Sequence, residues 1–272
     1  MMILDGLEDL DKTVYNGKVS VNNLNVGALL KDPTIGTLTI DIEIQGSGFT
    51  PKSLFARAKG DVHSFVYNNY RYNNIYFTGD FKNQLFNGIV KAKDSNLDFE
   101  FKGLADLSKK ESKFDFGVKV KHADLHALNF VQNDSISKFK GNIIIDGQGN
   151  SIDNVIGEIQ FRDLQYTNSR GNYTLENFEV KSSMDNEGIK KIHINSPDII
   201  NGYVTGTYKV AEIKKIFQNA FGSIYAHFKP YKIAENQFIN FDFTVNNKII
   251  EIFAPEVQIG KNTSLQGKNR RR

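Results

Sequence analysis

Apolar residues alternate with polar ones along much of this chain, at the period of two that marks a strand with one buried face. In Thr37–Ile44 every second residue is apolar, with Thr39, Asp41 and Glu43 between them. The same alternation recurs in later segments, at residues 97–101, 114–121, 159–161, 192–194 and 239–245. Strands packed between two layers of helices would be apolar on both faces. The pattern therefore predicts an all-β chain of antiparallel strands with one apolar face and one face that meets water.

Short turn-forming motifs separate these segments. Glycine and asparagine tolerate positive φ angles, and the predicted turns are Gly46-Ser47-Gly48, Asn87-Gly88, Gly147-Gln148-Gly149, Gly171-Asn172 and Asn201-Gly202. Their spacing predicts roughly 14 to 18 strands, most of them joined as hairpins. An open sheet of that size must twist, split or curl.

Two arrangements would shield the apolar face from water. In a β-sandwich, two such faces close on each other. In a single curled sheet, the face lines a groove. The alternation alone does not separate these arrangements, because both need the same pattern.

Helical segments are few. Residues 210–221 place apolar side chains on one side of a helical wheel, and Gly222 provides a stop. Asn25–Lys31 and Asp124–Phe130 are predicted as shorter helical turns. We expect these elements to cover an edge or an end of the sheet.

Two stretches about a hundred positions apart resemble each other. Val19–Val21 followed by Val26–Leu29 matches Val118–Val120 followed by Leu125–Leu128, and further on Ile44–Gly48 matches Ile145–Gly149. Repeats of this kind form units that stack on their neighbours. The chain is therefore predicted to be a single continuous β-repeat region over residues 1–272. Its units span approximately residues 17–115 and 116–222, with a partial third unit at 223–267.

Composition narrows the function classes. In 272 residues, Lys+Arg 34 and Asp+Glu 31 give a formal net charge of +3, and this near-balance argues against a dedicated nucleic-acid binder. The sequence has no cysteine, which excludes disulfides, thiolate metal sites and cysteine nucleophiles. The longest uninterrupted apolar run is Met1–Leu4, so we expect neither a membrane-spanning helix nor a signal peptide.

Candidate catalytic and metal-binding patterns are weak. His122 and His126 have a spacing that could ligate zinc on a helix, but no cysteine supports them. The carboxylates in residues 41–43 and 98–100 alternate with apolar neighbours, as on the solvent face of a strand. One aromatic cluster is interpreted as a cross-strand ladder, and it comprises Tyr67, Tyr70, Tyr72, Tyr76 and Phe77. The sequence predicts no catalytic residue, no metal site and no cofactor, and we do not expect an enzyme.

Several stretches resemble the large TamB-like envelope proteins, which are related to the AsmA-like proteins. These stretches are Lys31–Leu38 leading to Ile44–Pro51, Leu97–Gly103 with Ser108–Glu111, and Ile194–Gly202. The pattern is most similar to the Bacteroidetes type of this translocation and assembly module subunit. The resemblance covers roughly residues 17–267 and consists of repeat-type strand motifs, so the chain resembles an interior fragment.

This resemblance implies a repeating β-groove, which is a long curled antiparallel sheet with an apolar concave side and a few short helices. Proteins of this family are longer, are anchored in the inner membrane by an N-terminal helix, and reach across the periplasm. For this chain it implies a place in the periplasm or cell envelope and a role in shielding and conducting phospholipid between membranes, in supporting outer-membrane protein assembly, or in both. The implied partners are phospholipid acyl chains and, through other regions of a full-length protein, an outer-membrane assembly barrel of the TamA or BamA type.

The groove lining expected from the resemblance consists of the apolar members of the alternating strands. These residues are Leu38, Ile40, Ile42, Ile44, Phe99, Phe101, Phe114, Phe116, Val118, Val120, Ile159, Phe161, Ile192, Ile194, Phe241 and Phe243.

Two other functions remain open. A scaffold or chaperone module for outer-membrane proteins would template their strands on exposed sheet edges. A closed β-sandwich repeat would have a purely structural role. These alternatives differ from the groove in whether the apolar face stays open and whether strand edges stay unpaired.

Overall fold

The computed structural model describes residues 2–5, 8–50, 52–108, 110–151, 153–196, 199–212, 215, 232, 237–246, 260 and 263–270. Its strands are β1 (Met2–Asp5), β2 (Val14–Asn25), β3 (Ile35–Ser47), β4 (Phe55–Tyr67), β5 (Tyr70–Lys82), β6 (Leu85–Asp94), β7 (Leu97–Asp106), β8 (Lys113–Asp124), β9 (Ser137–Gln148), β10 (Ile156–Asn168), β11 (Gly171–Met184), β12 (Lys190–Ser196), β13 (Ile200–Thr207), β14 (Phe238–Val245) and β15 (Thr263–Arg270). The helices are α1 (Val26–Leu30) and the 3-10 helix η1 (Val210–Glu212).

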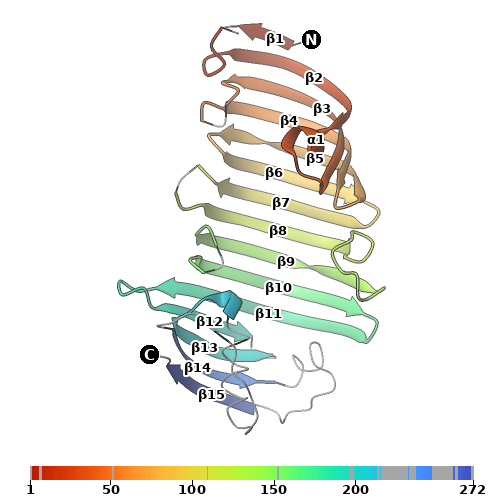
Figure 1. Ribbon diagram of the computed structural model, residues 1–272. Coiled ribbons are helices and arrows are strands. Elements are labelled where there is room, and N and C mark those ends of the chain that lie inside the picture. The colour runs from red at the N-terminus through yellow and green to blue at the C-terminus, as the bar shows by residue number, and fades with distance from the viewer. Residues whose placement is uncertain are drawn as a thin grey trace. The chain divides into compact units, whose positions relative to one another are not determined.

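The described strands form one 15-stranded sheet in which each strand lies beside its neighbours in the chain (Figure 1). The pairings from β1 to β8 and from β11 to β15 are antiparallel. The strand number falls within the predicted range, and the prediction of an all-β, curled antiparallel sheet with few helices is confirmed. No second sheet occurs in the described ranges, so the sandwich is not the arrangement found there.

The chain divides into two compact units. Unit 1 comprises Met1–Asp146 and Phe161–Glu176, and unit 2 comprises Gly147–Gln160 and Asn177–Arg272. The predicted boundary between the first two repeat units, near residue 116, falls inside unit 1. The division into repeats therefore stays a prediction, and the two units are described separately below.

Two-residue turns join the strands in the middle of unit 1. Asn68 and Asn69 between β4 and β5 both have positive φ angles (50° and 62°), as do Asn83 and Gln84 between β5 and β6 (47° and 68°). This is the backbone geometry of the type I′ hairpin, whose twist matches that of paired strands. Such turns let long antiparallel strands follow one another without a break.

Two of the predicted turns were wrong, and a third is displaced, because Gly171 and Asn172 begin β11 just after the turn at Ser169 and Arg170. Gly88 lies inside β6 and Gly202 lies inside β13. A methyl group built on Gly88 would lie 2.8 Å from Cζ of Phe86, and one built on Gly202 would lie 2.8 Å from Cδ1 of Phe243. At both positions a side chain would meet the backbone of the neighbouring strand as well as an aromatic ring, which is why glycine fits there.

The short helical turns follow β2 and β8, as predicted. In α1 the Asn25 side chain accepts a hydrogen bond from the Ala28 backbone N–H (2.9 Å), which is an N-cap. After β8 the Asp124 side chain accepts one from the Ala127 N–H (3.0 Å) and begins a turn of the same design. Of the helix predicted at 210–221, η1 is described, and the residues after it lie outside the described residues apart from Lys215.

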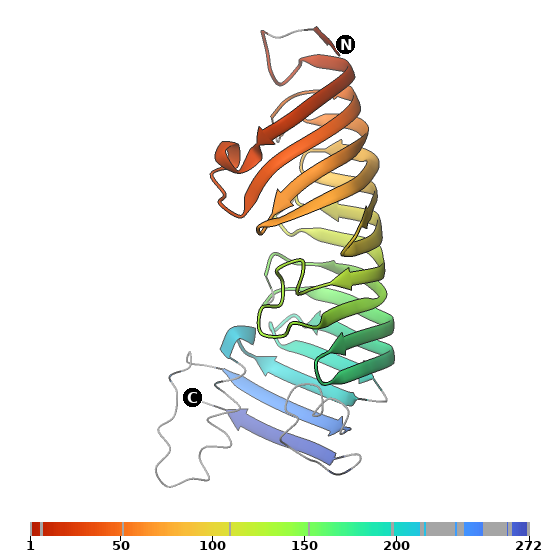
Figure 2. The same ribbon diagram turned by 90° about the vertical axis from the view of Figure 1, so that its right-hand side faces the viewer.

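The strands of unit 1 bend along their length, as Figure 2 shows from the side. In this view the loop after β8 lies on the side toward which the strands bend. Leu128 in this loop packs on the apolar residues of the sheet, so the apolar face lines the inner side of the bend. None of the helices that the structure describes has both the length and the apolar composition needed to cross a bilayer.

Candidate functional site

The apolar residues of β3 to β8 line up across the strands of unit 1. The pairing registers connect them into four lateral rows, none of which contains a polar residue. The first two rows are Ile40-Val62-Ile75-Ala92-Phe99-Val120 and Ile42-Gly60-Phe77-Val90-Phe101-Val118. The next two are Ile44-Ala58-Gly79-Gly88-Gly103-Phe116 and Gly46-Ala56-Phe81-Phe86-Ala105-Phe114. Because a one-residue slip would turn a strand's apolar side chains to the other face, this register is what makes the apolar face continuous.

The opposite, polar face carries cross-strand ion pairs. Glu43 on β3 contacts Lys18 and Lys59 on the two neighbouring strands, each at 2.6 Å. Lys91 and Glu100 pair at 3.1 Å between β6 and β7. Hydrogen bonds from Lys18 and Lys59 lower the pKa of Glu43 to about 2. One face of the sheet is therefore apolar and the other is charged.

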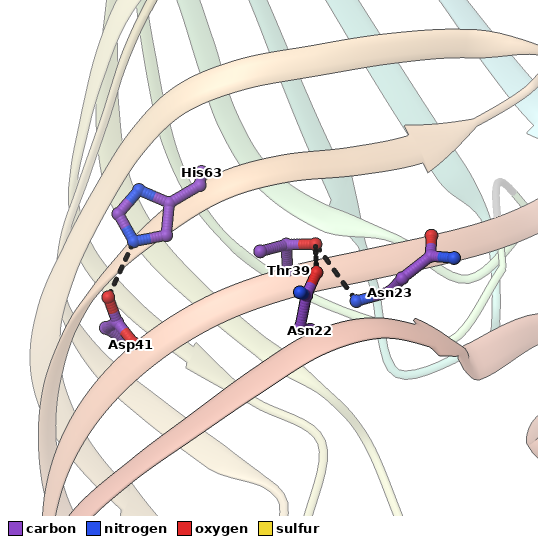
Figure 3. Close-up of polar contacts among 5 residues, drawn as sticks. All are labelled: Asn22, Asn23, Thr39, Asp41 and His63. Carbon is purple, nitrogen blue, oxygen red and sulfur yellow. Dashed lines mark hydrogen bonds and ion pairs between the residues drawn. The ribbon is translucent and has the colours of Figure 1, made fainter.

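Figure 3 shows further polar contacts around β3. Asp41 on the polar face contacts the His63 ring at 2.7 Å (Figure 3). The Thr39 hydroxyl oxygen accepts a hydrogen bond from the Asn23 N–H at 3.1 Å and lies 3.4 Å from the Asn22 side-chain oxygen (Figure 3). The contacts of Thr39 with Asn22 and Asn23 lie at a β-bulge between Val21 and Leu24. After the bulge, Leu24 and Asn25 pair with β3 again before α1 begins.

Two hollows also lie on the polar side of β2 to β5, with volumes of about 330 and 420 Å³. Lys18, Glu43 and Lys59 line both of them. In both hollows the Glu43 carboxylate is already shared between the ammonium groups of Lys18 and Lys59.

Aromatic rings form a connected series over the apolar face, here called the phenylalanine ladder (Phe77, Phe81, Phe86, Phe101 and Phe116). Consecutive ring centroids lie 6.4, 4.9, 6.0 and 4.9 Å apart along this series. These are ordinary separations for packed aromatic pairs. The ladder runs across β5, β6, β7 and β8, so it crosses the strands rather than following one of them.

Glycines lie beneath the rings of this ladder. A methyl group built on Gly60 would lie 3.0 Å from the Phe77 ring, and one built on Gly79 would lie 2.6 Å from the Phe86 ring. Any side chain at these positions would push the ring away from the sheet. The rings therefore pack directly on the backbone, and the apolar surface that they form lies close to the sheet.

One end of the apolar face is covered by the loop Asp124–Val131, here called the strap. Leu128 in the strap is 1% exposed and packs in a cluster with Tyr72, Val120 and Ala123. The Asn68 side chain donates to the Asn129 carbonyl, and the Asn129 side chain donates to the Asn68 carbonyl, each at 3.0 Å. The strap thus reaches from the end of β8 back to the β4–β5 turn.

A buried carboxylate lies close to the strap. Asp94, 8% exposed at the end of β6, accepts hydrogen bonds from the Tyr70 hydroxyl, from the Asn96 N–H at 2.9 Å, and from the N–H and side-chain amide of Asn73 at 3.0 and 3.2 Å. Burial raises the pKa of Asp94, but these hydrogen bonds outweigh it and hold the pKa below its ordinary value. The Asn96 carbonyl accepts a hydrogen bond from the Asp124 N–H at 2.9 Å, and this bond links the groups around Asp94 to the start of the strap.

Ten of the predicted lining residues lie on the apolar face of unit 1. They are Leu38, Ile40, Ile42, Ile44, Phe99, Phe101, Phe114, Phe116, Val118 and Val120. In unit 2, Ile192 and Phe241 both pair with Val204, and Ile194 and Phe243 both pair with Gly202. These four residues therefore share one face. Ile159 and Phe161 lie two residues apart on β10, with Ile159 in unit 2 and Phe161 in unit 1.

Sequence reasoning missed Phe81 and Phe86, and it named Phe77 in the predicted aromatic ladder but not among the lining residues. Asn74 has a positive φ angle of 53° inside β5, and the regular pairing after it places Phe77 and Phe81 on the same face as Ile75. Phe86 was missed because Asn87-Gly88 was interpreted as a turn. Tyr76, predicted in an aromatic ladder, instead lies on the polar face beside Asp61 and Lys91.

The two histidines considered for zinc have other surroundings. The Nδ1 atom of His126 lies 3.0 Å from the Val131 carbonyl oxygen and closes the strap, while His122 lies on β8. In the part of the chain that the structure describes, no group of three or more His, Cys, Asp or Glu side chains is placed to hold a metal ion.

Comparison of the chain with protein-family profiles, with curated proteins and with solved structures gives no significant match.

Proposed function

We propose that the apolar face of unit 1 binds phospholipid acyl chains and lets them move along it, as a segment of a cell-envelope protein that shields lipid between membranes or supports outer-membrane protein assembly. The observation that supports this proposal most strongly is the set of four lateral rows without a polar residue. The other face of the same sheet carries ion pairs instead. A contiguous apolar surface of this kind marks an interaction site rather than ordinary protein surface.

The mechanism proposed is passive. Each CH₂ group withdrawn from water contributes about 0.8 kcal/mol, so a chain lying across several strands gains several such increments. The phenylalanine ladder offers no hydrogen-bond donor or charge that would fix a chain at one position. The free energy therefore changes little as the chain slides, and no chemical step is needed.

The resemblance to TamB-like proteins motivates the envelope location, the phospholipid and the outer-membrane barrel partner of this proposal. The barrel partner would be engaged by other regions of a full-length protein. A strand-templating scaffold is the competing function. It would use the sheet edges rather than the apolar face, so a test directed at the face separates the two.

Site-specific photo-crosslinking in cells tests the proposal. A benzophenone amino acid at Phe116 should crosslink phospholipid, because this residue lies on the apolar face of β8. The matched control is Lys119 on the same strand, which faces the polar side and should not. Crosslinks from Phe116 to protein but never to phospholipid would refute lipid binding and favour the scaffold.

A substitution gives an independent check. Ile42→Asp places a carboxylate within the second lateral row and should abolish phospholipid crosslinking from Phe116. Glu43→Gln changes the adjacent residue on the polar face and should leave crosslinking unchanged. Equal effects of the two substitutions would contradict a role for the apolar face.

A further inference from the structure

Two equivalent turns of unit 1 place the same leucine in opposite surroundings. Leu29 of α1 and Leu128 of the strap occupy matching positions in the internal repeat, and both turns begin with a side-chain cap, at Asn25 and Asp124. Leu29 is 73% exposed, whereas Leu128 is 1% exposed. The turn is therefore a stable local structure whether its leucine meets solvent or packs on the sheet.

The surface beneath Leu128 continues the apolar face. Val120 belongs to the first lateral row, and Tyr72 pairs with Phe65 on the neighbouring strand. Leu97, Phe99 and other partly buried apolar residues pack around this cluster. Without the strap, this surface would extend the open apolar face toward the β4–β5 turn.

The strap is anchored at its base and closed by hydrogen bonds within itself. At the base, the Asp124 N–H donates to the Asn96 carbonyl (2.9 Å) and the Leu125 N–H donates to the Ser137 carbonyl (2.7 Å). The Leu128 N–H donates to the Asp124 carbonyl (3.0 Å), and the Asn129 N–H donates to the His126 carbonyl (3.0 Å). Two reciprocal hydrogen bonds between Asn68 and Asn129 join the strap to the β4–β5 turn. The tip of the strap around Leu128 and Asn129 can therefore swing outward about the anchored base at Asp124 and Leu125, once these two bonds and the Leu128 contact are broken.

We propose that the surface beneath Leu128 is a second acyl-chain subsite, which Leu128 fills in this structure and leaves when the tip of the strap swings outward. This inference rests on the proposed function, since it extends the same apolar face. The ligand class is a neutral hydrocarbon chain, because the cluster of Tyr72, Val120, Ala123 and Leu128 presents no charged side chain. In this structure the Leu128 side chain occupies the place that we assign to the acyl chain.

The absence of cysteine from the sequence allows the strap to be locked cleanly. The full chain with Asn68→Cys and Asn129→Cys is compared in its oxidised form, with the strap bonded to the turn, and its reduced form. Both substituted positions have positive φ angles (50° and 65°), so any backbone strain is common to the two forms. The chain with Asn68→Cys alone controls for oxidation, and Asn68→Gly with Asn129→Gly removes both side-chain bonds while keeping the left-handed backbone.

Each protein is irradiated with phosphatidylcholine vesicles that carry a diazirine in one acyl chain, and labelled residues are mapped by mass spectrometry. Labelling at Phe101 and Phe116 should occur in all forms. Labelling at Tyr72 and Val120 should be at least fivefold higher in the reduced form than in the oxidised form. The double glycine variant should exceed the unsubstituted chain at the same two residues.

The outcomes separate the two proposals. Labelling of the ladder residues with equal or no labelling of Tyr72 and Val120 in the oxidised and reduced forms would overturn the subsite while leaving the proposed function intact. No labelling of the ladder residues in any form would overturn the proposed function, and the subsite with it.

Discussion

Replacing Asp94 by asparagine should destabilise the part of unit 1 on which the strap rests. Asp94 accepts four hydrogen bonds through two oxygens: Oδ1 from Tyr70 and from the Asn96 N–H, and Oδ2 from the Asn73 N–H and side-chain amide. In asparagine one oxygen becomes an NH₂ group that would face these donors. One buried backbone N–H is then left without an acceptor.

The magnitude follows from these contacts. An unsatisfied buried donor costs about 1–3 kcal/mol, and the bonds that remain lose the strengthening that a charged acceptor gives. Together these effects predict a loss of about 2–4 kcal/mol for Asp94→Asn at pH 7. The matched control is Asp98→Asn in the next strand. Asp98 pairs with the exposed Lys121 at 3.6 Å, and its replacement should cost less than about 1 kcal/mol.

The pH dependence has a defined sign. The pKa of Asp94 is lower in the folded chain than in the unfolded one, where it is about 3.9. Its contribution to stability is therefore fully present above the unfolded pKa and is lost as the pH falls through the folded pKa. The difference in stability between the unsubstituted chain and Asp94→Asn should accordingly shrink in acid.

Urea unfolding followed by circular dichroism measures the total change. Hydrogen exchange of the amides in β5 to β7 localises it, which matters because a chain of two units need not unfold in one step. A free-energy loss for Asp94→Asn no larger than that for Asp98→Asn, or one that grows in acid, would refute the assignment of Asp94 as a stabilising carboxylate.

Two further predictions concern the two faces of the sheet. Gly88→Val should destabilise unit 1 by about 1–3 kcal/mol, because the added side chain meets the backbone of the neighbouring strand and the Phe86 ring; thermal unfolding would show this, and an unchanged melting temperature would mean that the ring does not rest on the glycine. At low ionic strength the Glu43 carboxyl should titrate near pH 2 by NMR, because Lys18 and Lys59 hydrogen-bond to it. Replacing Lys59 by methionine should raise the titration midpoint of Glu43, and added salt should raise it too. A midpoint that stays the same after both changes would contradict the ion pairs.

Local sequence determined the strands, and with them which residues share a face. The alternation at Ile40, Ile42 and Ile44 was sufficient to place these side chains together, because successive residues of a strand point to opposite faces. The capped turns after β2 and β8 were also predictable, since a side-chain cap and a short helical turn need only adjacent residues. The chemistry of the two faces could thus be anticipated before the sheet was known.

Only the tertiary structure decided which strands face each other in which register, and this changed several interpretations. Gly88 has the local sequence of a turn, yet it lies in β6, where it pairs with Gly79 on one neighbouring strand and Gly103 on the other. Leu29 and Leu128 have similar local sequences, but one is exposed and the other is buried. The difference arises because Leu128 alone has Tyr72, from a strand more than fifty residues earlier, beneath it. Burial depends on contacts between residues distant in sequence, and a local pattern does not contain them.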